Sequence, residues 1–129
     1  MIQLKRPVSI LLVEDNMLNQ KLMYYNLTKM GFDLNMVNNG QEAVETCKNK
    51  NYEFIMMDLM MPIMDGYQAT RAIRDIEKQT GNKSYIIGLT SNVYDSDKDK
   101  CLEAGMDEYM PKPFDIDVFI NTLKRENFL

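Results

Sequence analysis

The sequence predicts an α/β fold in which five parallel strands form one sheet with helices on both faces. Short apolar runs alternate five times with longer amphipathic segments along the chain. The connections between them are short, and parallel strands joined in this way need helical crossovers. With 129 residues, 45% of them hydrophobic, the chain has the size and composition of one domain with a buried core.

The first strand is predicted at Val8–Val13, a short aliphatic run suited to burial. Asn16 can cap a helix that continues to about Met30 and stops at Gly31. We expect its core face to consist of four residues that share one side in helical projection: Leu22, Met23, Leu27 and Met30.

Two further strand and helix pairs follow. Leu34–Val37 is predicted as a weaker second strand, and the helix after it covers Gly40 to about Lys50. Phe54–Met57 is an apolar run of strand length and is predicted as the third strand. After a loop, the third helix begins near Gly66 and ends before Gly81.

The last part of the chain repeats the alternation twice. Tyr85–Leu89 is the fourth predicted strand, and a polar helix follows at roughly Asp95–Ala104. A short fifth strand is predicted at Glu108–Met110. The final helix has a core stripe at i, i+3, i+4 and i+7: Ile116, Phe119, Ile120 and Leu123.

Composition and charge exclude several classes of protein. The formal net charge of −4 does not favour binding to nucleic acid or to an anionic membrane surface. No apolar run approaches the roughly 20 residues that cross a bilayer, so we expect a cytoplasmic protein. The chain contains no histidine, which excludes Ser-His-Asp and Cys-His catalysis and the usual zinc sites. Cys47 and Cys101 lack metal or redox spacing and are expected to be reduced thiols.

Reactive side chains stand at the ends of four predicted strands. Glu14 and Asp15 end the first strand, Asp58 the third and Thr90 the fourth, and Lys112 follows the fifth. Ligands of open parallel sheets bind beyond these strand ends. Carboxylates ~4 Å apart repel each other by about 4 kcal/mol at an effective dielectric of ~20, so a cation or protonation is needed. An all-oxygen site suits Mg²⁺, and Asp58 is then suited to act as a nucleophile towards phosphorus.

Five short motifs at these positions resemble the receiver domain of two-component response regulators. They lie in the order and spacing of that family, and the resemblance covers roughly Val8 to Leu123. The motifs are Leu11-Leu12-Val13-Glu14-Asp15-Asn16, Met57-Asp58-Leu59-Met60-Met61-Pro62, Met64-Asp65-Gly66, Leu89-Thr90-Ser91 and Tyr109-Met110-Pro111-Lys112-Pro113. Through Val13–Asn16 with Asn19 and Gln20, the pattern is most similar to receivers of hybrid sensor histidine kinases.

The resemblance implies a flavodoxin-like (βα)₅ doubly wound sheet with strand order 2-1-3-4-5. It implies one receiver domain over residues 1–129, with a core of about 8–124 and no output domain. Asp58 would take a phosphoryl group from a phosphohistidine on a sensor histidine kinase or a histidine phosphotransfer protein. The chain would be a signalling switch with slow autodephosphorylation, not an enzyme with a turnover substrate, and a monomer or a phosphorylation-linked dimer.

The resemblance also assigns roles to single residues. Asp15, Asp58 and the backbone carbonyl of Met60 would ligate Mg²⁺, with Glu14 acting partly through water. Lys112 would pair with the phosphoryl group, and its peptide bond to Pro113 would be cis. Thr90 would swing towards the phosphoryl group and Tyr109 would turn inwards. The face formed by the Asp95–Ala104 helix, the fifth strand and the last helix would then change.

Two positions near the acceptor influence phosphoryl lifetime in receivers. These are Met60, two residues after Asp58, and Asn92, two residues after Thr90. An apolar Met60 can shield phosphorus from water, which predicts a longer-lived phosphoryl group than an acidic or amide residue would give.

The outer face of the first helix is a candidate docking surface. Met17 and Tyr24 lie opposite the core face, flanked by Leu18 and Tyr25. Exposed apolar residues grouped in this way mark interaction sites, although single ones are common on any surface. We expect this face to receive the helices of the phosphodonor.

Two other functions fit a sheet with this acidic edge less well. A phosphohydrolase of the haloacid-dehalogenase type would need a second acid two residues after Asp58, where Met60 stands. A flavodoxin-like nucleotide-binding module would need a phosphate loop after the first strand, where Glu14 and Asp15 stand. Turnover of a small phosphate ester or tight binding of a flavin would distinguish these from a receiver.

Overall fold

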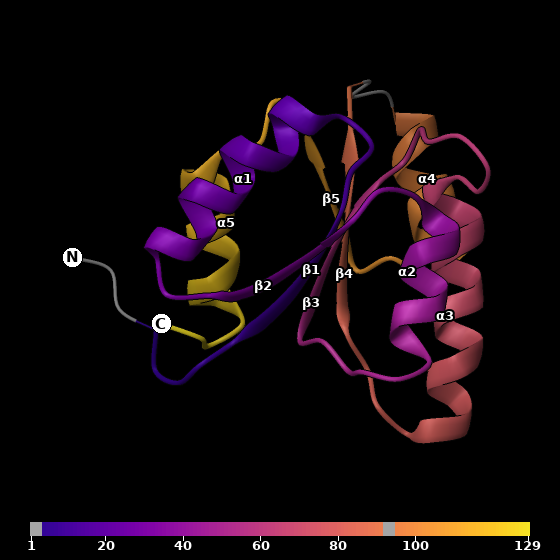
Figure 1. The fold of residues 1–129 in the computed structure, drawn as a ribbon, viewed down its shortest axis with the longest axis horizontal. Coiled ribbons are helices and arrows are strands. Elements are labelled where there is room, and N and C mark those ends of the chain that lie inside the picture. The colour runs from indigo at the N-terminus through magenta and orange to yellow at the C-terminus, as the bar shows by residue number, and fades with distance from the viewer. Residues whose placement is uncertain (1–3, 92–94) are drawn as a thin grey trace.

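The computed structural model describes residues 4–91 and 95–129 and confirms the predicted α/β fold. Its parallel strands form one sheet in the order β2-β1-β3-β4-β5. The strands are β1 (Ser9–Val13), β2 (Asp33–Val37), β3 (Phe54–Asp58), β4 (Tyr85–Thr90) and β5 (Glu108–Pro111). The helices are α1 (Met17–Lys29), α2 (Gly40–Cys47), α3 (Gly66–Thr80), α4 (Asp95–Ala104) and α5 (Ile116–Arg125). Figure 1 shows α1 and α5 on one face of the sheet and α2, α3 and α4 on the other.

Helix ends follow the local signals in the sequence. The side chain of Asn16 accepts a hydrogen bond from the Asn19 N–H at 3.0 Å and caps α1. Gly81 ends α3 in the left-handed conformation at φ 80°, where a residue without Cβ is favoured. α2 ends at Cys47, earlier than the predicted Lys50, because the last turn tightens: the amides of residues 49 and 50 both donate to the Thr46 carbonyl.

Two apolar clusters fill the two sides of the sheet. β3 is buried along its whole length and β1 along all but its first residue, which agrees with their apolar runs. On the α1/α5 side, the Phe119 ring packs edge-on against Phe54 at 5.5 Å between centroids. Phe119 and Leu123 of the predicted stripe are fully buried, whereas Ile116 and Ile120 are only partly buried.

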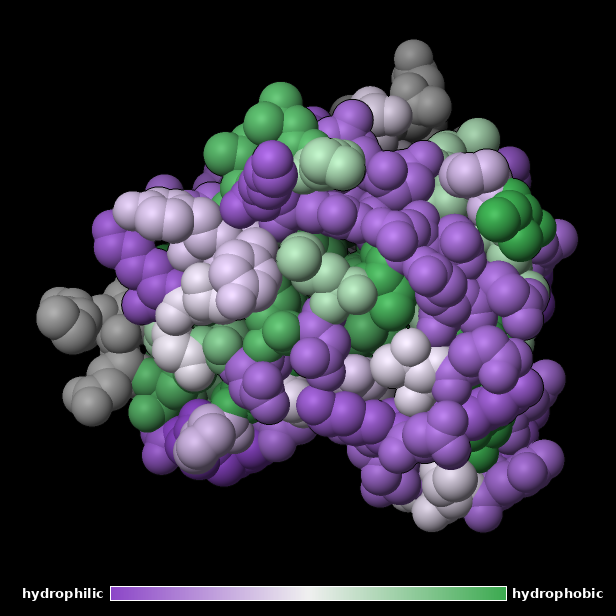
Figure 2. Space-filling model, viewed as in Figure 1, coloured by the Kyte–Doolittle hydropathy of each residue, from purple (hydrophilic) through white to green (hydrophobic). Residues whose placement is uncertain are grey.

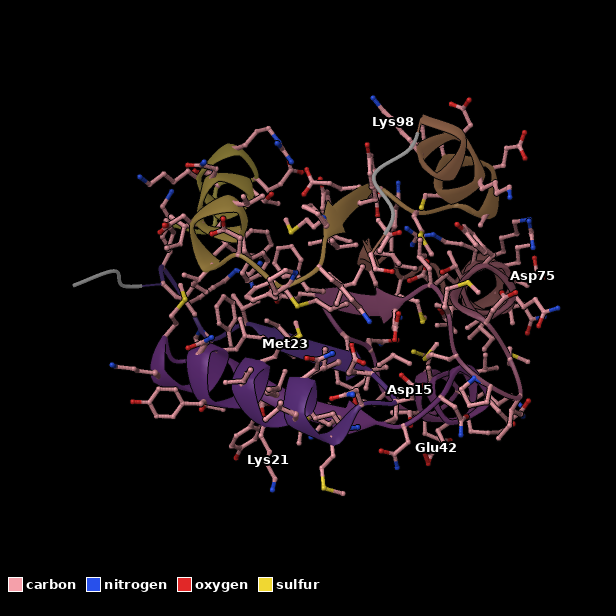
Figure 3. All side chains as sticks on the ribbon, turned by 90° about the horizontal axis from the view of Figure 1, so that it is seen from above. Asp15, Lys21, Met23, Glu42, Asp75 and Lys98 are labelled. Atoms are coloured by element: carbon pink, nitrogen blue, oxygen red, sulfur yellow. The ribbon has the colours of Figure 1, made fainter. Side chains whose placement is uncertain are left out.

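The core face of α1 differs from the prediction at Leu22. Met23 and Leu27 are buried, but the Leu22 side chain is 56% exposed. Figure 3 shows Met23 directed towards the sheet and Lys21 on the outer side of the helix. Leu22 is about 100° around the helix from Met23, so it lies at the flank of the buried stripe. There it borders a groove instead of the core.

The two cysteines agree with the expectation of unreactive thiols. Cys101 is buried, and Cys47 is half-buried. Burial, with a smaller contribution from the charge of Glu77, raises the pKa of the Cys47 thiol to about 11, so little thiolate forms near neutral pH. Across residues 4–91 and 95–129, no helix combines the length and apolarity needed to cross a membrane.

Candidate functional site

The sheet brings the predicted site residues to one edge. Glu14 and Asp15 follow β1, Asp58 is the last residue of β3, and Thr90 is the last residue of β4. Because β1 and β3 pair in register from Ile10 to Val13, the residues that follow these paired segments emerge side by side. Glu14, Asp58 and Thr90 are buried, whereas Asp15 is exposed.

Lys112 places one ammonium between two of these carboxylates. Its Nζ lies 2.9 Å from Asp58 Oδ1 and 3.2 Å from Glu14 Oε2. The contact to Glu14 is an ion pair without good hydrogen-bond alignment, since no described residue donates a hydrogen bond to Glu14 Oε2. The Lys112 N–H donates to the Thr90 carbonyl at 2.6 Å, which fixes the chain at the end of β5. The peptide bond from Lys112 to Pro113 is cis, as the resemblance implies.

The acidic residues fit a hard divalent cation. Carboxylate oxygens of Glu14, Asp15 and Asp58 all lie within 4.8 Å of one another. Lys112 neutralises only one of three negative charges, so the cluster keeps an excess of negative charge in a largely buried place. All of these candidate ligand atoms are oxygens, which suits Mg²⁺. Met60 stands at the rim, and its N–H donates to Asp58 Oδ1 at 3.3 Å.

Burial and charge shift the ionisation of the central pair. Burial, together with repulsion by Glu14, raises the pKa of Asp58 to about 6, although hydrogen bonds from Lys112 and the Met60 N–H act in the opposite direction. Burial alone would lower the pKa of Lys112, but the hydrogen bond and charge of Asp58, then Glu14, raise it above its usual value. Asp58 therefore presents an ionised oxygen near neutral pH, held by a cation on one side.

The two predicted switch residues lie on neighbouring strands. Thr90 is buried at the end of β4, and Tyr109 is half-buried in β5 opposite Gly88. Tyr109 borders a cavity of about 270 Å³ between α4 and β5, next to Cys101 and Leu102. Asn92 lies outside the described residues.

The predicted docking residues are exposed on α1. The exposed fractions are 69% for Met17, 66% for Leu18 and 46% for Tyr24. Figure 2 shows hydrophobic surface over the start of this helix. The three residues therefore form an accessible apolar face beside the acidic edge.

A groove of about 360 Å³ lies between α1 and the segment after β5 and reaches the site. Leu22 on α1 and Pro113 and Phe114 after β5 form its apolar walls, and Glu14 and Lys112 lie at its polar end. The sequence did not predict this groove, because Leu22 was expected in the core.

A hydrogen bond that supports the site from α1 was also not predicted. Gln20 donates to the backbone carbonyl of Glu14 at 2.5 Å. Asn19 and Gln20 belong to the motif pattern, but their spacing from Glu14 in the sequence does not predict a contact. Only the path of the chain from β1 into α1 brings the two together.

A flavodoxin-like sheet of order 2-1-3-4-5 with an acidic edge and one lysine defines a class of phosphoryl-accepting switch domains. The chain belongs to the response regulator receiver domain family, which it matches over residues 10–124. This confirms the family that the motifs predicted.

The sequence relatives include large kinases. The chain is 44% identical over 112 residues to hybrid signal transduction histidine kinase I of Dictyostelium discoideum, covering 83% of this chain and 6% of the kinase. It is 40% identical over 126 residues to hybrid kinase H of the same organism, covering 95% of the chain and 9% of the kinase. It is 35% identical over 122 residues to two-component response regulator 24 of Arabidopsis thaliana, covering 94% and 85%. The chain thus spans a small part of the kinases it matches.

Solved structures give the same result. The receiver domain of sensor histidine kinase PA1611 from Pseudomonas aeruginosa, with a magnesium ion coordinated in its active site cleft, is 39% identical with a TM-score of 0.82, covering 93% of this chain and 97% of that one. The co-crystal structure of the Saccharomyces cerevisiae phosphotransfer protein Ypd1 with the receiver domain of Ssk1 matches at 31% identity and a TM-score of 0.89, covering 100% and 95%. Both structures confirm the fold, and the PA1611 receiver holds Mg²⁺ in its active site cleft.

Proposed function

We propose that Asp58 accepts a phosphoryl group from a phosphohistidine on a sensor histidine kinase or a histidine phosphotransfer protein. The observation that carries this proposal is the pair of Asp58 and Lys112: a buried carboxylate at a strand end, 2.9 Å from one ammonium and beside two more carboxylates. The family membership and the Mg²⁺-bound relative support it.

Asp15, Asp58 and the Met60 carbonyl are the proposed Mg²⁺ ligands, with Glu14 acting partly through water. The three carboxylates lie close enough to share one ion. Bound Mg²⁺ supplies positive charge for the oxygens of the transferring group.

The chain's own residues perform the transfer and the switch. An Asp58 carboxylate oxygen forms the new bond to phosphorus while the P–N bond to the donor imidazole breaks, and the imidazole keeps the electron pair. The Lys112 ammonium balances the charge of the phosphoryl oxygens. Thr90 moves to donate to one of these oxygens, and Tyr109 turns into the space that it leaves.

The product differs from the starting state mainly in charge. Phosphorylation replaces the single negative charge of the ionised Asp58 carboxylate with roughly two negative charges on the phosphoryl oxygens. Moving a two-state equilibrium from 1:99 to 99:1 takes about 5.5 kcal/mol of differential stabilisation. The new contacts of Lys112 and Thr90 with the phosphoryl group supply the stabilisation of the phosphorylated state. The face of α4, β5 and α5 changes in response.

Intact mass after incubation with acetyl phosphate tests the phosphoacceptor. We expect the wild type to gain one phosphoryl group in Mg²⁺ and none in EDTA, and Asp58→Asn to gain none in either condition. Asp65→Asn, which changes an acid on the nearby loop, serves as the matched control and should be labelled like the wild type. Labelling of Asp58→Asn to the same extent would place the acceptor elsewhere.

Met60 is proposed to prolong the life of the phosphoryl group. Its side chain is 76% exposed beside Asp58 and places an apolar group where water approaches. We expect the acyl phosphate to decay several-fold faster in Met60→Asn, measured by loss of the phosphorylated mass after removal of the donor. Ile63→Asn, an equally exposed position in the same loop, is the control. Equal decay of Met60→Asn and the wild type would contradict the shielding role.

We propose that Met17, Leu18 and Tyr24 receive the phosphodonor's helices. Their exposure on the helix that follows Glu14 and Asp15 and the similarity to a receiver crystallised with a histidine phosphotransfer protein support this surface. Met17→Glu combined with Tyr24→Glu should slow transfer from the cognate donor at least tenfold, and labelling by acetyl phosphate should stay unchanged. Leu102→Glu with Val118→Glu, an equal change on α4 and α5, is the control. Unimpaired transfer to the first variant would remove α1 from the docking surface.

The remaining parts of the proposal concern the whole domain. Residues 8–124 act as one receiver, as a monomer or a phosphorylation-linked dimer. Its chemistry is a single transfer followed by slow autodephosphorylation, without a turnover substrate. We place it in the cytoplasm, where kinases draw on ATP.

A further inference from the structure

The peptide that follows Glu14 is held by a side chain. The Glu14 N–H donates to the Val37 carbonyl at 3.2 Å, which continues the pairing of β1 with β2. Its carbonyl oxygen lies between strand and helix, and no backbone N–H of the described residues donates to it. Gln20 Nε2 supplies the missing donor, at 2.5 Å.

The same nitrogen reaches a second anchor on the next loop. Gln20 Nε2 donates to Asn38 Oδ1 at 2.8 Å. Asn38 is itself fixed, since its N–H donates to Glu42 Oε1 at 2.7 Å at the start of α2. Both acceptors of the Gln20 amide are oxygens, so its NH₂ group, not its oxygen, must face them. The side chain therefore ties the loop after β1 to the loop after β2.

The tied peptide carries two of the acidic groups of the site. The carbonyl that Gln20 binds belongs to the peptide between Glu14 and Asp15, so its orientation sets the direction of both side chains. The Glu14 carboxylate has two restraints of its own: Oε1 accepts from the Asn16 N–H at 3.2 Å, and Oε2 faces Lys112 at 3.2 Å, but neither holds the backbone carbonyl. Release of the carbonyl would let this peptide rotate and move both carboxylates.

We propose that Gln20 is a positioning residue that fixes the peptide between Glu14 and Asp15 for Mg²⁺ binding. The inference rests on the proposed function, which gives these two acids their role. Groups that orient metal ligands without touching the metal typically contribute 10–100-fold to affinity. Gln20 therefore acts on the affinity for Mg²⁺ more than on the chemistry at Asp58.

The test is Mg²⁺ affinity by isothermal titration calorimetry. Gln20→Met keeps the length and helix preference of the side chain and removes the donor without a change of charge. We expect its Kd for Mg²⁺ to rise about tenfold. With acetyl phosphate, half-maximal labelling should need about tenfold more Mg²⁺, while the rate at saturating Mg²⁺ stays within about twofold of the wild type. If Gln20 had a purely structural role, Gln20→Met would lower the melting temperature in EDTA. It would then show no difference between its effect on the Mg²⁺ requirement and its effect on the rate at saturating Mg²⁺.

Matched variants separate the outcomes. Gln79→Met, the same change at an exposed position of α3, should bind Mg²⁺ like the wild type. If Gln20→Met does not fold, Gln20→Asn carries the test, because its amide is one methylene too short to reach both anchors. If the folded Gln20 variant binds Mg²⁺ as tightly as the wild type, the inference about Gln20 is wrong and the proposed function still stands. If the wild type itself binds no Mg²⁺, both the inference and the proposed function are wrong.

Discussion

Replacing Lys112 with Met is expected to destabilise the metal-free domain by about 3 kcal/mol and to tighten Mg²⁺ binding at the same time. Lys112 is the cation that lies within 3.2 Å of both Glu14 and Asp58, and these two carboxylates are nearly inaccessible to water. Removal of one partner of a buried pair leaves the other charge without compensation, which costs more than the pair itself contributes. Breaking a buried ion pair typically costs about 3–5 kcal/mol. We expect the lower value here because the Lys112 side chain is 23% exposed.

The same argument gives the sign of the metal effect. Lys112 and Mg²⁺ both draw on the negative charge of Glu14 and Asp58, so the ammonium weakens the attraction for the ion. Without it, Mg²⁺ should bind at least tenfold more tightly. At a concentration of 100 times Kd, a ligand adds about 2.7 kcal/mol of stability, so Mg²⁺ should restore most of the loss in Lys112→Met.

Urea unfolding in EDTA and in saturating Mg²⁺ measures both effects. Lys78→Met, which removes an exposed lysine of α3, should change the free energy of unfolding by less than about 0.5 kcal/mol in either condition. Labelling by acetyl phosphate should nevertheless fall about 100-fold in Lys112→Met, because the phosphoryl oxygens lose a cation. Weaker Mg²⁺ binding in Lys112→Met would show that Lys112 organises the acidic residues instead of competing for them.

The sequence was sufficient for the features that local rules determine. The apolar runs of β1 and β3 predict strands buried on both faces, and Asn16 and Gly81 mark helix ends by capping chemistry. The acidic site follows from topology, since parallel strands deliver Glu14 and Asp58 to one edge. The family motifs then added the order of the strands, which periodicity alone leaves open.

The features that the sequence did not reveal depend on which segments of the chain meet in the folded structure. Leu22 belongs to the apolar pattern of α1, but the space beyond it is a groove, so periodicity assigned it wrongly to the core. Gln20 and Arg74 are polar helix residues whose partners come from other loops. Local pattern does not distinguish Arg74 from Arg71, three residues earlier on the same helix. The Arg74 side chain is mostly buried, whereas Arg71 is exposed.

Arg74 supports the second large prediction, since Arg74→Met is expected to lower the free energy of unfolding by about 4 kcal/mol. Its guanidinium donates to the carbonyls of Gly105 and Ser84, each at 2.8 Å. It also pairs with Glu77 at 2.6 Å and Asp107 at 2.7 Å, and all three charged side chains are at most 20% exposed. The variant would leave the two carboxylates without their closest cation and the two carbonyls without the guanidinium donor, in a poorly hydrated place.

Urea unfolding of three variants separates charge from geometry. Arg71→Met, the same change on the exposed side of α3, should cost less than about 0.5 kcal/mol. Arg74→Lys keeps the charge but lacks the planar set of donors that reaches four acceptors, so it should recover less than half of the loss. A loss below about 1.5 kcal/mol in Arg74→Met would mean that water replaces the guanidinium at this site.

The position of Arg74 also connects this stability to the proposed switch. Gly105 ends α4, and Asp107 precedes β5 and accepts the Ile86 N–H at 2.8 Å. Arg74, in the second half of α3, thus holds the turn between α4 and β5 at the end of the sheet opposite Asp58. Amide hydrogen exchange of Arg74→Met should therefore speed up first in α4 and β5, while β1 and β3 stay protected. Equally faster exchange in all strands would instead show that the contacts of Arg74 stabilise the whole domain and not the face of α4, β5 and α5 in particular.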